Sequence, residues 1–197
     1  MLSLLPALSK VGILGTNPPH DPRHGSPCRW RKAPTAAIID IQSVRTASQP
    51  GVRGYDAGKK ITGKKHHILV DTQGNIHALK VTTADVQDRD GTKLLLNVLT
   101  MACGWLMLIW ADGSCARKLV EYVAEIPRHR RVKLEIWKRS DEINAFKVVP
   151  KRWIIERMIG WFVQSRRLVR DYEVKIEHLR AIIYLLTTKE IIARINS

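Results

Sequence analysis

Short apolar runs alternate along this chain with segments of helical periodicity, and this alternation restricts the fold more than any other feature. Runs of strand length occur near residues 36–40, 66–71, 76–82, 106–111 and 132–138. Helix-like segments begin at about Gly91 and at Arg117, span Lys151 to Leu168, and recur around Ile176 to Leu186. We therefore predict an α/β fold with a mixed sheet flanked by helices.

Three acidic residues occupy places where such a fold can hold a metal ion. Asp40 closes the apolar run 36–39 and Asp112 closes the run 106–111, so we expect each to follow a buried strand. Glu156 lies in the helix predicted after Pro150. Ligands gather at the carboxyl ends of strands, and oxygen donors from separate elements suit Mg²⁺ or Mn²⁺. The alternative for each aspartate is a turn residue or a helix N-cap.

The charge of the chain points to a polyanionic partner. Lys and Arg number 33 against 18 Asp and Glu, which gives a net charge of +15. The partner is most simply DNA, although a membrane surface or ribosomal RNA would also attract such a chain. Basic residues gather in a glycine-interleaved arm (Arg53 to Lys65), between Arg128 and Arg139, and on the Glu156 helix.

We expect eight of the lysines and arginines in the first and third runs to contact the DNA backbone, the alternative being a solvated face. They are Lys59, Lys60, Lys64, Lys65, Arg152, Arg157, Arg166 and Arg167. Arg152 precedes Glu156 by four residues, so it either orients this carboxylate, touches a phosphate, or forms an ordinary surface ion pair. Trp153 and Trp161 are expected in the core, with stacking on a displaced base as the alternative.

Neither a membrane span nor a secretory leader is expected. The apolar stretch 94–110 falls short of the ~20 residues that a spanning helix needs, and a buried helix followed by a buried strand explains it better. No basic leader precedes the leucine-rich N-terminus. We therefore expect a cytoplasmic protein of bacterial origin.

Five stretches, in order along most of the chain, closely resemble bacterial insertion-sequence transposases of the DDE type, and most of all the insertion sequence five group. They are AAIIDIQSVRT (36–46), GYDAGKKITGKKHHILVDT (54–72), ADVQDRDG (84–91), IWADG (109–113) and PKRWIIER (150–157). The resemblance implies a ribonuclease-H-like fold and metal-dependent DNA cleavage and strand transfer. It also implies that Asp40, Asp112 and Glu156 form the catalytic, metal-holding triad. Its implied partners are element ends and target DNA, bound by a homodimer on paired ends.

The same resemblance suggests two regions, an irregular tail over 1–34 and a catalytic domain over 35–197. The tail does not resemble the DNA-binding helices usual in the family, which indicates a truncated or frameshifted reading frame. The catalytic blocks also depart from the usual pattern, at Ile41, at Ser114 and Cys115, and at Val163 and Gln164. The alternative function is therefore an inactive remnant that binds DNA nonspecifically; a purely structural protein ranks third.

Overall fold

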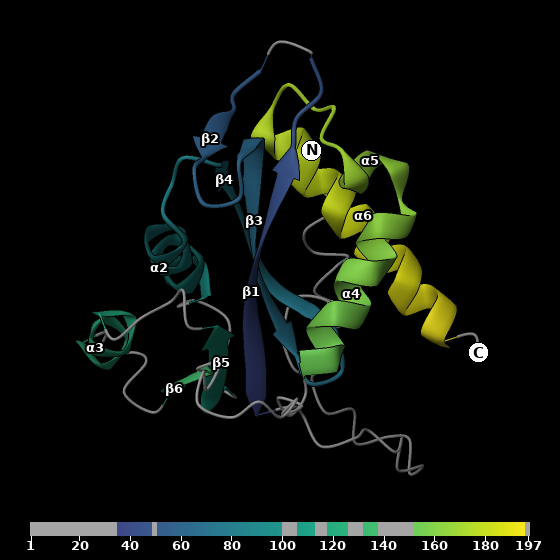
Figure 1. The fold of residues 1–197 in the computed structure, drawn as a ribbon. Helices are drawn as coiled ribbons and strands as arrows, with labels where there is room; N and C mark the ends of the chain where they lie inside the picture. The colour runs from purple at the N-terminus through teal and green to yellow at the C-terminus, as the bar shows by residue number, and fades with distance from the viewer. Residues whose placement is uncertain are drawn as a thin grey trace, which may run out of the picture.

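The structure, a computed structural model, describes residues 35–48, 51–99, 106–112, 118–125, 132–137 and 152–195 (Figure 1). The strands are β1 (Ala36–Arg45), β2 (Gly54–Asp56), β3 (Ile61–Asp71), β4 (Ile76–Thr83), β5 (Leu108–Asp112) and β6 (Lys133–Trp137). The helices are α2 (Asp88–Leu99), α3 (Lys118–Glu125), α4 (Arg152–Gln164), α5 (Arg166–Val169) and α6 (Ile176–Ile195).

The strands form one mixed sheet in the order β2-β3-β1-β5-β6, with β4 also paired to β3. The pairs of β3 with β1, β2 and β4 are antiparallel, whereas β5 runs parallel to both β1 and β6. Parallel neighbours need a crossover, and α3 supplies it between β5 and β6. This confirms the predicted α/β class and is consistent with the ribonuclease-H-like arrangement.

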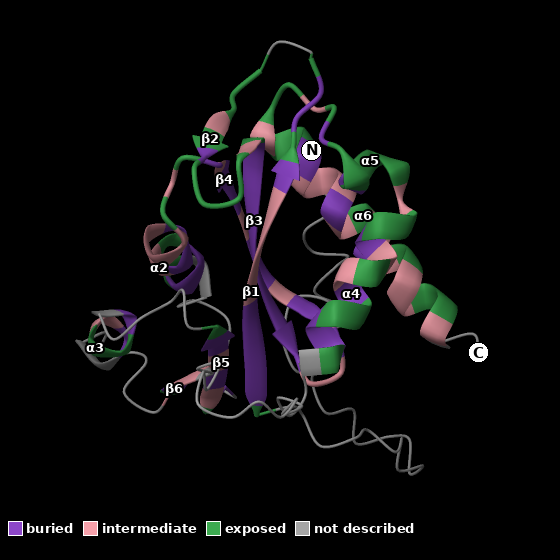
Figure 2. Cartoon of the chain, in the orientation of Figure 1, coloured by how far each residue is buried: buried purple, intermediate pink, exposed green. Residues whose placement is uncertain are grey.

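Each face of the sheet is covered by its own set of helices. Side chains alternate along a strand, so Ala37 and Ile39 of β1 face one core, which also contains residues of α2 and α3. Ile38 faces the other core, with residues of α4, α5 and α6. Figure 1 shows these two helix groups on opposite sides of the sheet, and Figure 2 shows the strands between them largely buried. The described part of the chain contains no helix long and apolar enough to cross a membrane.

Several elements differ in extent from their predictions: β3 begins at Ile61 instead of residue 66, and α6 continues past Leu186 to Ile195. Strand β1 continues beyond residue 40 because Ile41 to Arg45 pair with β3 residues His67 to Gly63, so Asp40 lies within the strand and not at its end. The helix expected over 151–168 is broken at Ser165 into α4 and α5. The basic arm is a hairpin, in which β2 pairs with the beginning of β3.

Candidate active site

Asp40 and Asp112 lie side by side on neighbouring parallel strands. Ile39 pairs with Ala111, and the two aspartates are the next residues on β1 and β5. Alternation places both on the face that carries Ile38 and Trp110, which is the face covered by α4. Asp40 is half-buried and Asp112 is exposed, so the pair stands where the sheet meets solvent.

Glu156 lies on the helix that covers this same face. Helix α4 contacts β1 through a buried side formed by Ile154, Ile155, Met158 and Phe162. Glu156 itself is exposed. At 3.6 residues per turn, it lies roughly 140° around the helix from Trp161, which faces α6 across a pocket. Glu156 therefore lies on the part of α4 that is turned away from α6. Helix α6 itself contacts β4, which pairs with the edge of β3 opposite to β1.

The structure thus puts all three acids on one face but does not gather them into one cluster. Within the described ranges, no group of three or more His, Cys, Asp or Glu side chains is arranged to hold a metal ion. Asp40 and Asp112 are brought together by strand register, whereas Glu156 remains on the solvent side of its helix.

A fourth acid, Glu135 of β6, lies on this face and was not singled out from the sequence. It pairs directly with Trp110 in the sheet, and its Oε2 accepts a hydrogen bond from Trp110 Nε1 at 3.1 Å. Its Oε1 lies 2.9 Å from Lys133 Nζ. The Lys133 contact and the Trp110 hydrogen bond lower the pKa of this carboxyl group. The alternation of Lys133 and Glu135 with apolar neighbours was the only sequence signal for this placement.

Lys64 and Lys65 lie inside the protein, not on the surface where DNA could be contacted. Lys64 Nζ is 2.8 Å from Asp171 Oδ2, both side chains are 0% exposed, and the ammonium also donates to the Glu173 carbonyl oxygen at 2.6 Å. Lys65 Nζ is 2.8 Å from Asp88 and 3.3 Å from Asp56. Successive strand residues point to opposite faces, so each lysine is buried under a different set of helices.

The protonation of Lys65 reflects this environment. Burial alone would lower its pKa, but the hydrogen bond and charge of Asp88, together with those of Asp56, outweigh burial and raise it. Asp56 in turn accepts a hydrogen bond from Ser43 at 2.8 Å. Lys65 therefore stays charged inside the fold, where it joins β3 to the beginning of α2 and to β2.

Other basic residues of the prediction remain on the surface. Lys59 and Lys60 are exposed in the β2–β3 turn, and Lys59 Nζ donates to the Ile41 carbonyl oxygen at 3.2 Å. Arg166 and Arg167 are exposed on α5, where Arg167 lies 3.8 Å from Glu173. The side chain of Arg152 and the run from Arg128 to Arg131 lie outside the described residues.

Residues 31–188 match the family model of the transposase DDE domain, well over half of the 197 residues. The chain belongs to the transposase DDE domain family. Comparison with curated proteins gives no match. The matched region of this transposase domain contains Asp40, Asp112 and Glu156, and membership of the family assigns the chain a role in DNA transposition.

Members of this transposase family generally use divalent metal ions, and two of the acids present fit such an ion. Mg²⁺ is commonly bound through one or two carboxylates, with water and substrate phosphate completing its shell. Asp40, half-buried, and Asp112, exposed, are adjacent in register and would provide this donor set. Glu156 is exposed on α4 and, within the described residues, does not form a three-acid group with them.

The departures from the family pattern fall in different environments of the transposase domain. Ile41 packs against the core on the α2 side, away from the face of the aspartates. Val163 and Gln164 are exposed on α4, and Ser114 and Cys115 lie outside the described residues. Trp161 is partly buried against the core, but the expectation that Trp153 is a core residue is wrong, because its side chain is 54% exposed.

Proposed function

We propose that this chain is the catalytic domain of an insertion-sequence transposase of the insertion sequence five group, cutting DNA at element ends and joining them to target DNA. The observation that carries the proposal is the placement of Asp40 and Asp112 side by side on the face covered by the Glu156 helix. Mg²⁺ or Mn²⁺ would be held by Asp40 and Asp112, with Glu156 as the third carboxylate.

The reaction is two phosphoryl transfers. In the first, the oxygen of a water molecule bonds to phosphorus at the element end and the bond to the 3′ oxygen breaks, which leaves a free 3′ hydroxyl. In the second, the oxygen of this hydroxyl bonds to the phosphorus of a target phosphodiester and the bond from that phosphorus to the target's 3′ oxygen breaks. One phosphodiester thus replaces another, and the target strand is left with a free 3′ hydroxyl. A divalent cation supplies activation of the attacking oxygen and stabilisation of the leaving oxygen. The carboxylates of Asp40 and Asp112 fix the location of this chemistry on rigid strands.

The exposed basic residues give the DNA a path beside this site. The β2–β3 turn carries Lys59 and Lys60, and α5 carries Arg166 and Arg167. Figure 1 shows β2 and α5 on either side of the same end of β1, and the backbone of Asp171, just after α5, pairs with the residues that follow β1. We propose that these four side chains bind phosphates. Affinity should then fall steeply with salt, and less steeply when any of them is removed.

A plasmid-nicking assay with the full chain tests the catalytic part of the proposal. We expect Mg²⁺- or Mn²⁺-dependent nicking by the wild-type protein and none above background with Asp40→Asn, Asp112→Asn or Glu156→Gln. All three variants should still bind DNA in EDTA. Glu177→Gln, which removes an exposed acid on α6, is the matched control and should nick normally. Equal nicking by the triad variants would exclude these residues as the catalytic carboxylates.

A second function, DNA binding without cleavage, is favoured by the absence of a three-acid cluster from the described residues. It requires that the wild-type protein bind DNA equally well with Mg²⁺ and with EDTA, and that it nick with neither.

Light scattering of the protein with and without paired element ends would test the proposed homodimer.

A further inference from the structure

Two arginines from distant parts of the chain meet at one tryptophan. The guanidinium groups of Arg157 on α4 and Arg194 in the last turn of α6 each lie 5.1 Å from the ring centroid of Trp161. Arg157 also lies 4.8 Å from the ring of Trp153, one turn earlier on α4. Guanidinium groups stack on indole rings more readily than ammonium groups do, because they are planar and weakly hydrated.

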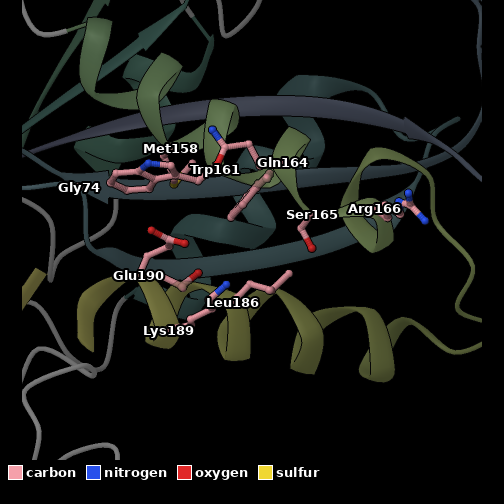
Figure 3. Close-up of a pocket in the computed structure, with 11 residues that line it drawn as sticks. Gly74, Met158, Trp161, Gln164, Ser165, Arg166, Leu186, Lys189 and Glu190 are labelled. Carbon is pink, nitrogen blue, oxygen red and sulfur yellow. The ribbon is translucent and has the colours of Figure 1, made fainter. Parts of the chain in front are cut away.

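Both arginines also reach the same carbonyl group. Arg194 Nη1 donates to the Gln73 oxygen at 3.0 Å, and Arg157 Nη2 lies 3.5 Å from it. The next residue, Gly74, has φ +90, and a Cβ there would come within 3.2 Å of Arg157 Nη2. A side chain at this position would therefore strain the turn and crowd the arginine. Figure 3 shows Gly74 beside Trp161, at one end of a pocket of about 380 Å³ lined by α4 and α6.

The turn that receives the arginines is itself rigidly held. Asp71, at the end of β3, accepts hydrogen bonds from the backbone of Gln73 and Asn75 at 2.7 and 3.0 Å, and from His77 at 2.8 Å. Burial and the nearby charge of Arg157 lower the pKa of Arg194, whereas the charge of Asp71 acts in the opposite direction. The two cations are thus held close together against a fixed point of the sheet.

We infer that Arg157 is a positioning residue: with Arg194 and Trp161 it ties α4 to the β3–β4 turn, fixes the rotation of α4, and so sets where Glu156 stands. Glu156 is the residue immediately before Arg157, about 100° around the helix, so any rotation about the α4 axis moves both together. This inference rests on the proposed role of Glu156 and reassigns Arg157, which the sequence had grouped with the DNA contacts.

Binding of Mn²⁺ alone, without DNA, measures this role directly. We expect Arg157→Met to weaken Mn²⁺ binding by roughly 10- to 100-fold, the range for residues that support metal ligands indirectly. Arg157→Lys keeps the positive charge but loses the planar guanidinium group, which stacks on the indole rings and presents several N–H donors, so it should not restore Mn²⁺ binding. Arg194→Met should weaken Mn²⁺ binding in the same way, although it lies at the other end of the chain from the aspartates.

DNA binding in EDTA supplies the opposite readout. Arg157→Met and Arg157→Lys should bind DNA with wild-type affinity, and the salt slope, which is the slope of log affinity against log salt concentration, should be unchanged. In the nicking assay kcat should fall while KM stays the same. The matched control is Arg166→Met, an exposed arginine on α5, which should flatten the salt slope by about one and leave Mn²⁺ binding intact. Circular dichroism and thermal melting would show that each variant is folded.

The outcomes separate this inference from the proposed function. If the wild-type chain binds no Mn²⁺, both fail together. In a second outcome, the wild-type chain binds Mn²⁺ and nicks DNA, but Arg157→Met binds Mn²⁺ as tightly as the wild type and its DNA affinity depends less steeply on salt. Arg157 is then a DNA contact, and only the inference is overturned. If Arg157→Met does not fold, Arg157→Lys and Arg194→Met decide by the same two readouts.

Discussion

The buried ion pair between Lys64 and Asp171 should control the stability of this domain. Replacing Lys64 by Met removes the ammonium but leaves the Asp171 carboxylate with 0% exposure. Its remaining hydrogen bonds come from Thr46 Oγ1 at 3.1 Å and from the Glu173 backbone at 2.9 Å. The segment after α5 would then have an uncompensated charge where it joins β1 and β3.

The size of the effect follows from the geometry. At 2.8 Å, two unit charges attract by roughly 6 kcal/mol at an effective dielectric constant of about 20. Desolvation of both groups offsets much of this attraction, but removing one partner exposes the desolvation cost of the other. Breaking a buried pair in this way costs about 3–5 kcal/mol. Domains of this size are stable by about 5–15 kcal/mol, so Lys64→Met should remove a large part of the free energy of unfolding.

Urea denaturation followed by tryptophan fluorescence measures this loss. With a slope of about 2 kcal/mol/M, a loss of 4 kcal/mol lowers the midpoint by about 2 M. The double variant Lys64→Met with Asp171→Leu removes both charges and should be more stable than Lys64→Met alone. Lys133→Met is the matched control, because its pair with Glu135 has a similar distance of 2.9 Å but is exposed; its midpoint should hardly move. A double variant as unstable as the two single losses added together would refute the reasoning.

Two further perturbations test the packing of the sheet. Burial lowers the pKa of His66 and His67 to about 4, while the unfolded chain takes up these protons near pH 6.5. The stability that they contribute is complete above pH 6.5 and is lost as the pH falls toward 4, by on the order of 3 kcal/mol per histidine. His66→Leu should flatten urea midpoints between pH 7 and 4.5, and no flattening would contradict the burial argument; the exposed His178, changed to Gln, is the control. Gly91→Ala places a methyl group against the His67 ring and should lower the melting temperature. Its control is Gly160→Ala, whose methyl group meets nothing within 4 Å and should stabilise the protein by about 0.5–1 kcal/mol. Equal melting temperatures for Gly91→Ala and the wild type would show that α2 can shift away from β3.

Elements with a local signal were predictable from the sequence. The strands β5 and β6 and the helix α3 have apolar residues at the expected spacing, and the structure places their ends within a few residues of the prediction. Helix α6 begins at Ile176 as predicted but continues to Ile195, beyond the predicted Leu186. Asp112 also ends its strand as expected. In each case neighbouring residues alone decide the local conformation, because one side of the element is continuously apolar.

The far half of β1 was not predictable in this way. Gln42, Ser43 and Arg45 interrupt the apolar pattern, so the run seemed to end at Asp40. These residues are extended because they pair with β3, whose partners follow only after the hairpin. The position of Asp40 within the strand therefore depends on non-local pairing, and only the face on which it lies follows from alternation once β1 is known to continue.

The basic hairpin shows why total charge and individual charges predict different things. Lys64 and Lys65 were grouped with the DNA contacts because two of their carboxylate partners, Asp88 on α2 and Asp171 after α5, come later in the chain and no local pattern indicates them. Asp56, which also pairs with Lys65, lies in the same hairpin. Internal ion pairs cancel in the net charge, however, so the excess of +15 must reside on other side chains. Burial of these two lysines therefore leaves the argument for a polyanionic partner intact. It moves the expected contacts with that partner from strand β3 to the exposed turn that precedes it and to α5.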